Sequence, residues 1–595
     1  MKPATSTRTP IAQHSLHYFP TPPTTFSSQF DSGNLGRVEQ VSPDVFALWT
    51  VPDCFGTLVE SSCRSWFYFC VKVQPPRRLT LTIKNLNLQG KLYREGMKPV
   101  VRTSKAPWSR LAGPVAYTVA GEVATLFEVT FTYECVEEET WFAFSYPWSC
   151  SENQTYMDLI ADQAAEKALF VHRTTLVMSL EGRKCDLLAL SSHTDLTAST
   201  PQACPRPLYP LGNPLPSLCT SKSYVFVSAR VHPGETPASY MLKGLLDWLV
   251  SEDPRAQAAR DRFVFVIVPV LNPDGVFRGH YRLDTRGTNL NRCYTSPDLA
   301  LSPTIWAVKE LISQLNSQGN LHAYIDLHAH ASKRGVFVYG NHMDFWRAVT
   351  ARAFAKTLSL NCAYFDLEGS IFDEEHMKTQ DSSGSKEGAG RVALYMATGL
   401  PLCFTLEANF NSGGTASSVL SSGLEQDSEE ERDSRTVRLY DTDLFGRVGK
   451  ALGVTLLDSI EGNRHSRVAA AGFKCYLDLK ASIAESLSAL PQYRNDEVIR
   501  KQLKAKYDFL ASKSRPTLPK PKLPPRYSRP ALNRSHSKTP SNDPRERTLL
   551  PRPGRRLSSE APLVSRRSAM VTPCRKQQSS RKPSYESRDL IVALS

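Results

Sequence analysis

Two different hydrophobic patterns follow each other along the chain. Between Phe26 and Trp148, short stretches rich in aromatic and β-branched residues alternate apolar and polar positions, with turn residues between them. The stretches are RSWFYFCVKV (Arg64–Val73), RLTLTIKNL (Arg78–Leu86), LFEVTFTYE (Leu126–Glu134) and TWFAFSYPW (Thr140–Trp148). Such alternation is typical of strands with one buried face, so the pattern predicts a small antiparallel β-sandwich over residues 25–150.

From about Phe170 onward, strand-like and helix-like segments take turns. The expected strands are Ser223–His232, Arg262–Asn272, His322–His330, Gly335–Gly340 and Leu402–Asn409, and the expected helices are Glu152–Leu169, Pro237–Val250 and Leu444–Ile460. RFVFVIVPVLN (Arg262–Asn272) is almost continuously apolar, which is typical of a strand in a sheet covered on both faces. The pattern therefore predicts an α/β domain over residues 151–465, with a mostly parallel mixed sheet flanked by helices.

Four segments lie outside these two domains or interrupt them. Residues 1–24 are rich in Thr and Pro, and residues 513–595 are rich in Pro, Ser and Arg, so both are expected to be disordered. Residues 412–434 are first Gly- and Ser-rich and then acidic, which predicts a mobile loop. Residues 466–512 are expected to form a helical extension.

Charge is distributed unevenly. The 595 residues carry a net charge of +14, but residues 513–595 alone hold 20 Lys or Arg and five Asp or Glu, so the rest of the chain is nearly neutral. This basic tail would attract acidic proteins or nucleic acid. No aromatic-interleaved RNA motif accompanies it, so a nucleic-acid role is not predicted. RRLSSE (Arg555–Glu560) and RRS (Arg566–Ser568) are candidate phosphorylation sites.

The first residues lack the continuous apolar stretch of a secretory signal. The longest apolar run, Phe263–Leu271, is far shorter than the roughly 20 residues that a membrane span needs. Thirteen cysteines are scattered without a C-x-x-C pair, which argues against a disulfide framework and against a thiolate zinc site. The expectation is a soluble cytoplasmic protein.

Candidate metal ligands stand at the ends of predicted strands. His232 and Glu235 form an H-x-x-E pair in RVHPGETP, just where a strand gives way to a helix, and His328 ends another strand. In open α/β sheets, sites form at the carboxyl ends of strands, so these side chains are expected to meet. A His₂Glu set that leaves one position for water is typical of catalytic zinc, and His330 remains a rival ligand or an outer partner.

A second carboxylate, Glu407 in FTLEAN, also falls at a strand end. Burial in an apolar strand would raise its pKa towards the range of a general base, and a salt-bridged strand end is the alternative. Arg282, Asn291 and Arg292 follow in NPDGVFRGHYR and RGTNLNR. Arginine and asparagine donors of this kind suit the terminal carboxylate of a peptide, or one arginine holds the oxyanion of the scissile carbonyl.

The order of these motifs resembles that of the zinc metallocarboxypeptidases. HPGETPAS, NPDGVFRGHYR, LNR, DLHAHASKRG and SKEGAGR are similar to the cytosolic carboxypeptidase branch, and FSSQFDSGNLGRVE (Phe26–Glu39) and RSWFYF to its amino-terminal β-domain. The resemblance spans roughly residues 26–460 and leaves the tail uncovered.

The resemblance implies one zinc ion held by His232, Glu235 and His328, with Glu407 as general base and then acid. It implies that Arg282 polarises the carbonyl, while Asn291 and Arg292 hold the terminal carboxylate. Many relatives have Asp where this chain has Asn289, two residues before Asn291; an amide still accepts an imidazole N–H but makes the ligand less basic.

The resemblance also implies a substrate class. Cytosolic members remove glutamates, including branch-point glutamates, from polyglutamylated tubulin and related acidic tails. Lys386 and Arg391 are expected to line the specificity pocket and pair with a glutamate side chain; ordinary surface charge is the alternative. Lys333 and Arg334 are further candidates, and Tyr395 is the candidate for the pocket tyrosine of the family.

Three alternatives to deglutamylation stay open at this point. They are a detyrosinating carboxypeptidase, an amidohydrolase of small N-acyl amino acids, and a microtubule-binding protein with a weak catalytic domain. The expected partners are polyglutamylated tubulin and other acidic protein tails, without membrane contact, and the expected state is a monomer. The expected location is the cytoplasm, with microtubule association or the nucleus as variants.

Overall fold

The structure, a computed structural model, describes residues 18–21, 23–120, 126–199, 208–381, 383–414, 419–420, 437–460, 462–503 and 505. The predicted tail at 513–595, most of the predicted disordered segment at 1–24 and most of the predicted acidic loop at 412–434 lie outside these residues. Ser412–Gly413, the start of that loop, is instead strand β23, which is buried and pairs with β24 (Arg438–Leu439).

The amino-terminal domain consists of two β-sheets packed face to face. The six-stranded sheet has the order β1-β2-β5-β11-β7-β8, and the five-stranded sheet the order β3-β4-β6-β10-β9. All pairs are antiparallel except β4 with β6. The elements are β1 Tyr18–Thr21, β2 Thr24–Ser27, β3 Arg37–Ser42, β4 Val45–Trp49, β5 Tyr68–Val73, β6 Arg77–Asn87, α1 Gly90–Arg94, β7 Val100–Thr103, β8 Ser109–Arg110, β9 Val115–Val119, β10 Leu126–Cys135 and β11 Glu139–Ala143.

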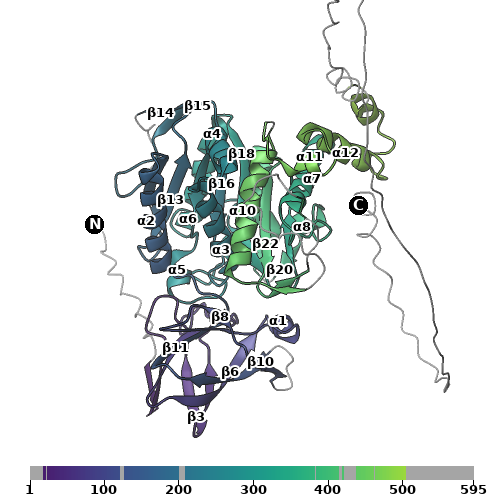
Figure 1. Ribbon diagram of the computed structural model, residues 1–595. Helices are drawn as coiled ribbons and strands as arrows, with labels where there is room; N and C mark the ends of the chain where they lie inside the picture. The colour runs from purple at the N-terminus through teal and green to yellow at the C-terminus, as the bar shows by residue number, and fades with distance from the viewer. Residues whose placement is uncertain are drawn as a thin grey trace, which may run out of the picture. The chain divides into compact units, whose positions relative to one another are not determined.

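The second domain is built on a seven-stranded mixed sheet of order β12-β13-β17-β16-β18-β22-β19 (Figure 1). The four strands β17, β16, β18 and β22 run parallel, and antiparallel strands flank them on both sides. The strands are β12 Phe170–Met178, β13 Lys184–Ser191, β16 Ser223–Ala229, β17 Phe263–Val268, β18 Leu321–His330, β19 Val336–Tyr339 and β22 Cys403–Asn409. The predicted fold class is confirmed.

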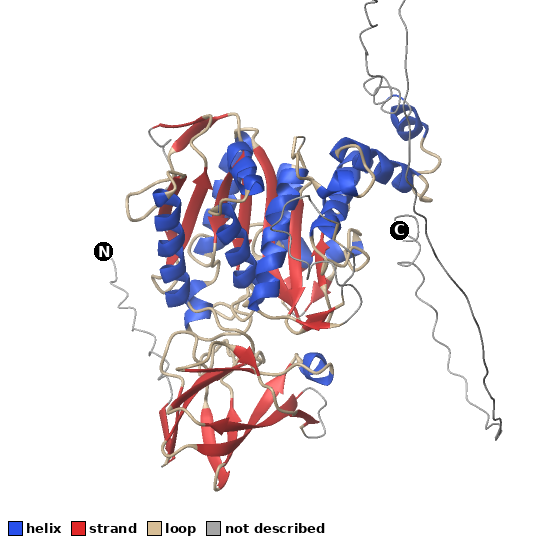
Figure 2. Ribbon diagram, in the orientation of Figure 1, coloured by secondary structure: helices blue, strands red, loops and turns tan. Residues whose placement is uncertain are grey.

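Helices cover both faces of this sheet (Figure 2). The helices are α2 Cys150–Glu166, α3 Pro237–Leu249, α4 Pro254–Arg262, α5 Pro273–Phe277, η1 Leu290–Arg292, α6 Pro303–Ser317, α7 Phe345–Asn361, α8 Glu375–Lys378, η2 Lys386–Gly388, α9 Gly390–Thr398, α10 Thr442–Asp458, α11 Arg467–Ala470 and α12 Tyr476–Ser488. The short strand pairs are β14 Leu196–Ser199 with β15 Ser217–Thr220, and β20 Gln380–Asp381 with β21 Gly384–Ser385.

The apolar central strands contribute side chains to two separate hydrophobic cores. In β17, Phe263, Phe265 and Ile267 enter the core beneath α3, α7 and α10, whereas Val264, Val266 and Val268 enter the core beneath α6 and α9. Because side chains alternate across a strand, a strand buried on both faces has to be apolar throughout. This explains the nearly continuous apolar run that the sequence shows here.

Helix boundaries follow from local capping chemistry. Helix α2 begins at Cys150 because the Ser149 side chain accepts the N–H of Glu152, while the Glu152 carboxylate accepts the N–H of Ser149. Helix α3 begins at Pro237, directly behind the H-x-x-E turn, where proline has no N–H to lose. The sequence therefore places the start of α3 two residues after Glu235.

None of the helices within the described ranges is long and apolar enough to cross a membrane.

Candidate active site

The register of three neighbouring parallel strands brings the candidate residues together. Strand β18 pairs with β22 so that His328 stands directly opposite Glu407, and β16 pairs with the other side of β18. Paired residues point to the same face, so His328 and Glu407 share one face of the sheet. On this face of the sheet, the apolar side chains of β17 pack beneath α6 and α9. Towards the ends of β18 and β22, the same face carries buried polar side chains instead.

The turn that carries His232 and Glu235 is held by a buried arginine. Arg230 follows β16 with a left-handed backbone (φ 59°), and its side chain is 2% exposed. Its guanidinium donates to the carbonyl oxygens of Pro233 and Trp148 and to the Ser239 hydroxyl at 2.9 Å each. A non-glycine residue in this conformation stores strain that surrounding contacts must offset. Arg230 thus fixes the direction in which the turn leaves the sheet.

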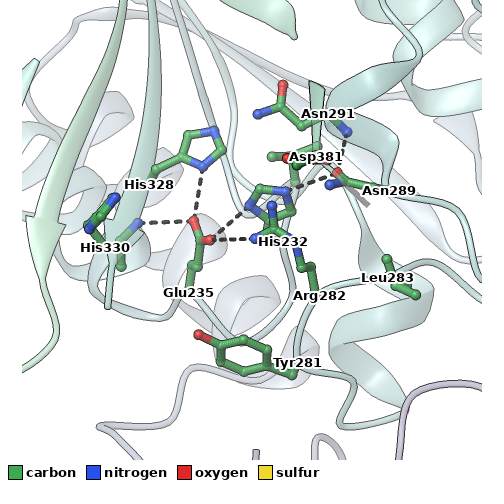
Figure 3. A network of polar contacts seen from close by, with 12 residues as sticks. His232, Glu235, Tyr281, Arg282, Leu283, Asn289, Asn291, His328, His330 and Asp381 are labelled. Carbon is green, nitrogen blue, oxygen red and sulfur yellow. Dashed lines mark hydrogen bonds and ion pairs between the residues drawn. The ribbon is translucent and has the colours of Figure 1, made fainter. Parts of the chain in front are cut away.

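His232, Glu235 and His328 form one buried cluster (Figure 3). Nδ1 of His232 lies 2.8 Å from Glu235 Oε1, and Nδ1 of His328 lies 2.9 Å from Glu235 Oε2. One ligand atom from each of the three residues falls within 4.8 Å of the others. The Ala329 N–H also donates to the Glu235 carboxylate at 3.0 Å and fixes its orientation.

The outer nitrogens of both histidines face acceptors. His232 Nε2 lies 3.0 Å from Asn289 Oδ1, and His328 Nε2 lies 2.8 Å from Asp326 Oδ2. Each Nε2 therefore carries its proton, which leaves the Nδ1 lone pairs directed at the Glu235 carboxylate. Lone pairs and a carboxylate this close repel one another unless a cation or a proton lies between them. The donor set thus fits a zinc ion, with two imidazole nitrogens and a carboxylate.

Burial, followed by the nearby Arg282 charge, lowers the pKa of His232 to about 4, so this imidazole stays neutral, while the pKa directions of His328 and Glu235 point to a cation. Burial opposes the charged imidazolium, but the carboxylates of Asp326 and Glu235 raise the pKa of His328 well above its usual value. Burial likewise opposes the charged form of Glu235, but His232 and His328 hold its pKa well below the usual range. A positive charge is therefore favoured at the centre of the cluster.

Glu407 experiences the opposite environment. Burial, followed by the nearby Glu235 charge, raises its pKa to about 8, although His328 and Arg282 act against this. Its Oε2 atom has no hydrogen-bond partner among the described residues. A buried carboxyl whose pKa lies near neutrality is well suited to accept and return a proton.

A cavity of about 340 Å³ opens onto this cluster. Its wall contains nine of the residues that the sequence singles out as ligands, catalytic groups or substrate contacts: His232, Glu235, Arg282, Asn291, Arg292, His328, Lys386, Arg391 and Glu407. The structure therefore brings together residues that are up to 175 positions apart in the chain.

Three donors from the two loops face this cavity. Arg282 Nη1 lies 3.8 Å from Glu235 Oε1, and Figure 3 shows its guanidinium next to the His–Glu–His cluster. Asn291 Oδ1 accepts the Gly390 N–H at 3.0 Å, which orients the amide. Arg292 forms an ion pair with Asp381, and its buried Nε has no partner within the described part of the chain.

The two predicted specificity residues differ in burial. Arg391 is 4% exposed, and its guanidinium donates to Asn341 Oδ1 at 2.9 Å and to the carbonyl oxygen of His376 at 3.0 Å. Burial lowers the pKa of Arg391 to about 10. Lys386 is half-buried, and burial, Arg292 and Arg391 lower the pKa of its ammonium.

Other candidates do not reach the cavity wall. Tyr395 lies on α9 outside it, and the tyrosines that line it within the described ranges are Tyr281 and Tyr339. Lys333 donates to the Gly369 carbonyl, and Arg334 pairs with Glu95 of the amino-terminal domain at 2.9 Å.

His330 does line the cavity but lies outside the metal cluster. Its Nδ1 accepts the Lys333 N–H at 2.9 Å, and its Nε2 lies 3.4 Å from the Tyr339 hydroxyl. His330 therefore fits the role of a residue next to the metal ligands better than the role of a ligand itself.

Two further functional candidates escape the sequence argument. Asp326 stands two residues before His328 on the same strand face, so the D-x-H alternation already carries a signal for it. Tyr339 lies opposite Thr405, two residues from Glu407, because β19 pairs antiparallel with β22. No local sequence pattern reveals this pairing, so the sequence alone does not place Tyr339 at the site.

Comparisons with known proteins agree with this site. Residues 156–400 match the family described as "Zinc carboxypeptidase", and residues 26–145 match the "Cytosolic carboxypeptidase N-terminal domain". The chain is 33% identical over 586 residues to cytosolic carboxypeptidase-like protein 5 of Rattus norvegicus, an alignment that covers 77% of this chain and 70% of that protein. It is also 33% identical over 406 residues to cytosolic carboxypeptidase 6 of Homo sapiens, covering 66% of this chain and 74% of that protein.

A solved metallo-carboxypeptidase from Burkholderia cenocepacia has the same fold. Its TM-score is 0.54 at 22% identity, over 73% of this chain and 98% of that one. The chain spans about two thirds of the length of the first curated relatives, with 66–70% of each covered.

Fold, cluster and cavity define a zinc carboxypeptidase, a peptide hydrolase whose family implies a zinc cofactor. More specifically, the chain belongs to the cytosolic carboxypeptidase family.

Replacing Asp326 by Asn should weaken zinc binding about 10- to 100-fold, because an amide makes the His328 imidazole a poorer donor than a carboxylate does. Asn289→Asp should shift the affinity in the opposite direction through His232. Competition with a chromophoric chelator measures both. Asp458→Asn, in a buried position of α10 away from the cavity, is the matched control. Equal zinc affinities in Asp326→Asn and the wild type would contradict the role assigned to the contact between Asp326 and Nε2 of His328.

The raised pKa of Glu407 predicts that the zinc-free protein becomes less stable as the pH rises. Between the ordinary glutamate pKa and about 8, the folded protein binds more protons than the unfolded chain, so stability falls as the pH rises through this window. Glu407→Gln carries no charge and escapes this loss. Its melting temperature should match the wild type near pH 5 and exceed it by a few degrees near pH 8.

The exposed substitution Glu368→Gln serves as the control for that series. A melting-temperature difference between Glu407→Gln and the wild type that stays constant from pH 5 to pH 8 would argue against a raised pKa.

Proposed function

We propose that this carboxypeptidase removes glutamates from the ends or branch points of acidic protein tails, such as those of polyglutamylated tubulin. The charge of the cavity wall supports this most directly. Among the residues that the structure describes, four cations line it, namely Arg282, Arg292, Lys386 and Arg391, against the three carboxylates of Glu235, Asp381 and Glu407.

Two of these cations lack a carboxylate partner. Glu235 faces the two histidines and Asp381 pairs with Arg292, whereas neither Lys386 nor Arg391 forms an ion pair within the described residues. Arg391 also lowers the pKa of Lys386, so the two charges oppose each other. An anionic group between them would relieve this repulsion and regain the energy lost on burial.

A carboxy-terminal glutamate carries two anionic groups that match these features. Its α-carboxylate suits the donors of Asn291 and Arg292, where the Arg292 Nε remains available. Its side-chain carboxylate suits Lys386 and Arg391. A terminal tyrosine would offer only the first carboxylate and would leave the two unpaired cations in contact with an aromatic ring.

The reaction proposed for this site is hydrolysis of the last amide bond. Bound to His232, Glu235 and His328, zinc would supply a Lewis acid that activates water and polarises a carbonyl. Glu407 takes the proton from the attacking water and passes it to the nitrogen of the leaving glutamate. Arg282, next to Glu235, holds the negative charge that develops on the carbonyl oxygen.

The chain also carries a charge that suits acidic substrates at longer range. Residues 513–595 hold a net charge of +15, and electrostatic attraction of this kind raises the encounter rate with acidic tails. The proposed partners are therefore acidic protein tails, and the proposed location is the cytoplasm where such tails are found.

A matched series of peptides tests the proposal. Zinc-loaded protein is incubated with acidic peptides that end in Glu-Glu, Gln, Tyr or a branch-point glutamate, and mass spectrometry follows the products. Successive loss of glutamates is expected, with kcat/KM for Glu about 10- to 100-fold above that for isosteric Gln. Glu407→Gln should bind zinc and release nothing. Faster release of Tyr than of Glu would point instead to a detyrosinating enzyme.

Lys386→Gln tests the source of the preference. Removing the ammonium should lower the Glu-to-Gln ratio of kcat/KM about tenfold and leave the Gln peptide nearly unaffected, because only the anionic side chain loses a partner. Lys378→Gln is the matched control, since Lys378 is exposed, pairs with Glu374 and lies outside the cavity. An unchanged Glu-to-Gln ratio in Lys386→Gln would assign the preference to other residues.

A further inference from the structure

A carboxylate of the amino-terminal domain holds the loop that carries Arg282. Asp53 accepts three consecutive backbone N–H groups, from Tyr281 at 2.6 Å, Arg282 at 2.8 Å and Leu283 at 2.9 Å. The Asp53 residue is 1% exposed and follows β4, so it reaches the loop from the other domain.

We propose that Asp53 is a positioning residue for Arg282, so that the amino-terminal domain completes the active site of the catalytic domain. The inference rests on the proposed role of Arg282 at the carbonyl oxygen.

The three N–H groups depend on this one carboxylate. Residues 281–283 belong to neither a helix nor a strand, so no ladder supplies acceptors for them. A buried backbone donor that has lost its interactions with water destabilises the fold unless another acceptor replaces them. A carboxylate that accepts three of them fixes the backbone on both sides of the Arg282 Cα, and with it the point from which the side chain starts.

Neighbouring contacts limit the loop further. Gly279 has φ 64°, and a Cβ there would meet the carbonyl oxygen of Gly33 at 2.5 Å, so only glycine allows the two domains this close. Asn34 donates to the Gly279 carbonyl oxygen at 2.9 Å, and the Gln89 amide donates to the Tyr281 hydroxyl. The loop is therefore held by the amino-terminal domain at several successive residues.

The same loop reaches the chemistry directly. Figure 3 shows Tyr281, Arg282 and Leu283 beside the cluster, and Arg282 Nη1 lies 3.8 Å from Glu235. The Tyr281 carbonyl oxygen accepts the N–H of Gly234 at 2.8 Å, between the two metal-cluster residues of the H-x-x-E turn. A displacement of about 1 Å at a charge-stabilising group costs up to 100-fold in rate, so the anchoring of this loop matters for catalysis.

The test uses full-length, zinc-loaded protein and a Glu-ending peptide. Asp53→Ala should lower kcat about 10- to 100-fold with KM changed less than about threefold and zinc content unchanged. Asp53→Asn keeps one acceptor oxygen and should fall between Asp53→Ala and the wild type; it also serves if the alanine variant does not fold. Glu95→Gln is the matched control, because it breaks the interdomain pair with Arg334 and leaves Arg282 untouched.

A double-mutant comparison separates positioning from general destabilisation. If Asp53 acts through Arg282, Asp53→Ala added to Arg282→Ala should lower kcat by no more than about twofold, since interacting residues are not additive. An equal fall in both backgrounds, an unchanged kcat in folded Asp53→Ala, or a fall explained by lost zinc would each overturn the inference. If Arg282→Ala itself leaves kcat unchanged while glutamates are still released, the proposed role of Arg282 fails, although the proposed substrate stands.

Discussion

The active site depends on the register between parallel strands β16, β18 and β22. The pairing of His328 with Glu407 places a metal-cluster histidine and a buried carboxyl side by side, and β16 delivers the H-x-x-E turn at the same edge. A slip of one residue in β22 would turn Glu407 towards the opposite core. The register is secured by the apolar residues that alternate between two cores, so packing far from the site determines its geometry.

Two buried carboxylates in this site receive opposite protonation preferences from their surroundings. Glu235 is surrounded by His232, His328 and an N–H donor, which together favour its charged form. Glu407 lies close by, its Oε2 atom has no hydrogen-bond partner among the described residues, and burial favours its neutral form. The same residue type therefore serves once as a metal ligand, Glu235, and once as a proton carrier, Glu407. The difference comes from the surroundings of each side chain in the fold and not from its neighbours in the sequence.

Strand ends and periodicity are local properties, so they were sufficient for the fold class and for His232, Glu235, His328 and Glu407. The loop residues at the cavity followed instead from the order of the motifs and from the family resemblance. It indicated Asp326 only faintly, since the D-x-H spacing has meaning only once the strand face is known. Tyr339 and Asp53 depend on an antiparallel pairing and on an interdomain contact, and neither leaves a local pattern. Tyr395, chosen for its place in the chain, lies on a helix that turns it away from the cavity.

The hydrophobic core beneath α3 and α10 does not stop at the boundary between the domains. Phe144 of the amino-terminal domain has ring contacts with Tyr281 and Phe410 of the catalytic domain, with centroids 6.0 Å and 5.3 Å apart. Both domains therefore contribute side chains to one continuous apolar cluster. Separating the domains would expose apolar side chains of both to water, so the stability of each domain is coupled to the presence of the other.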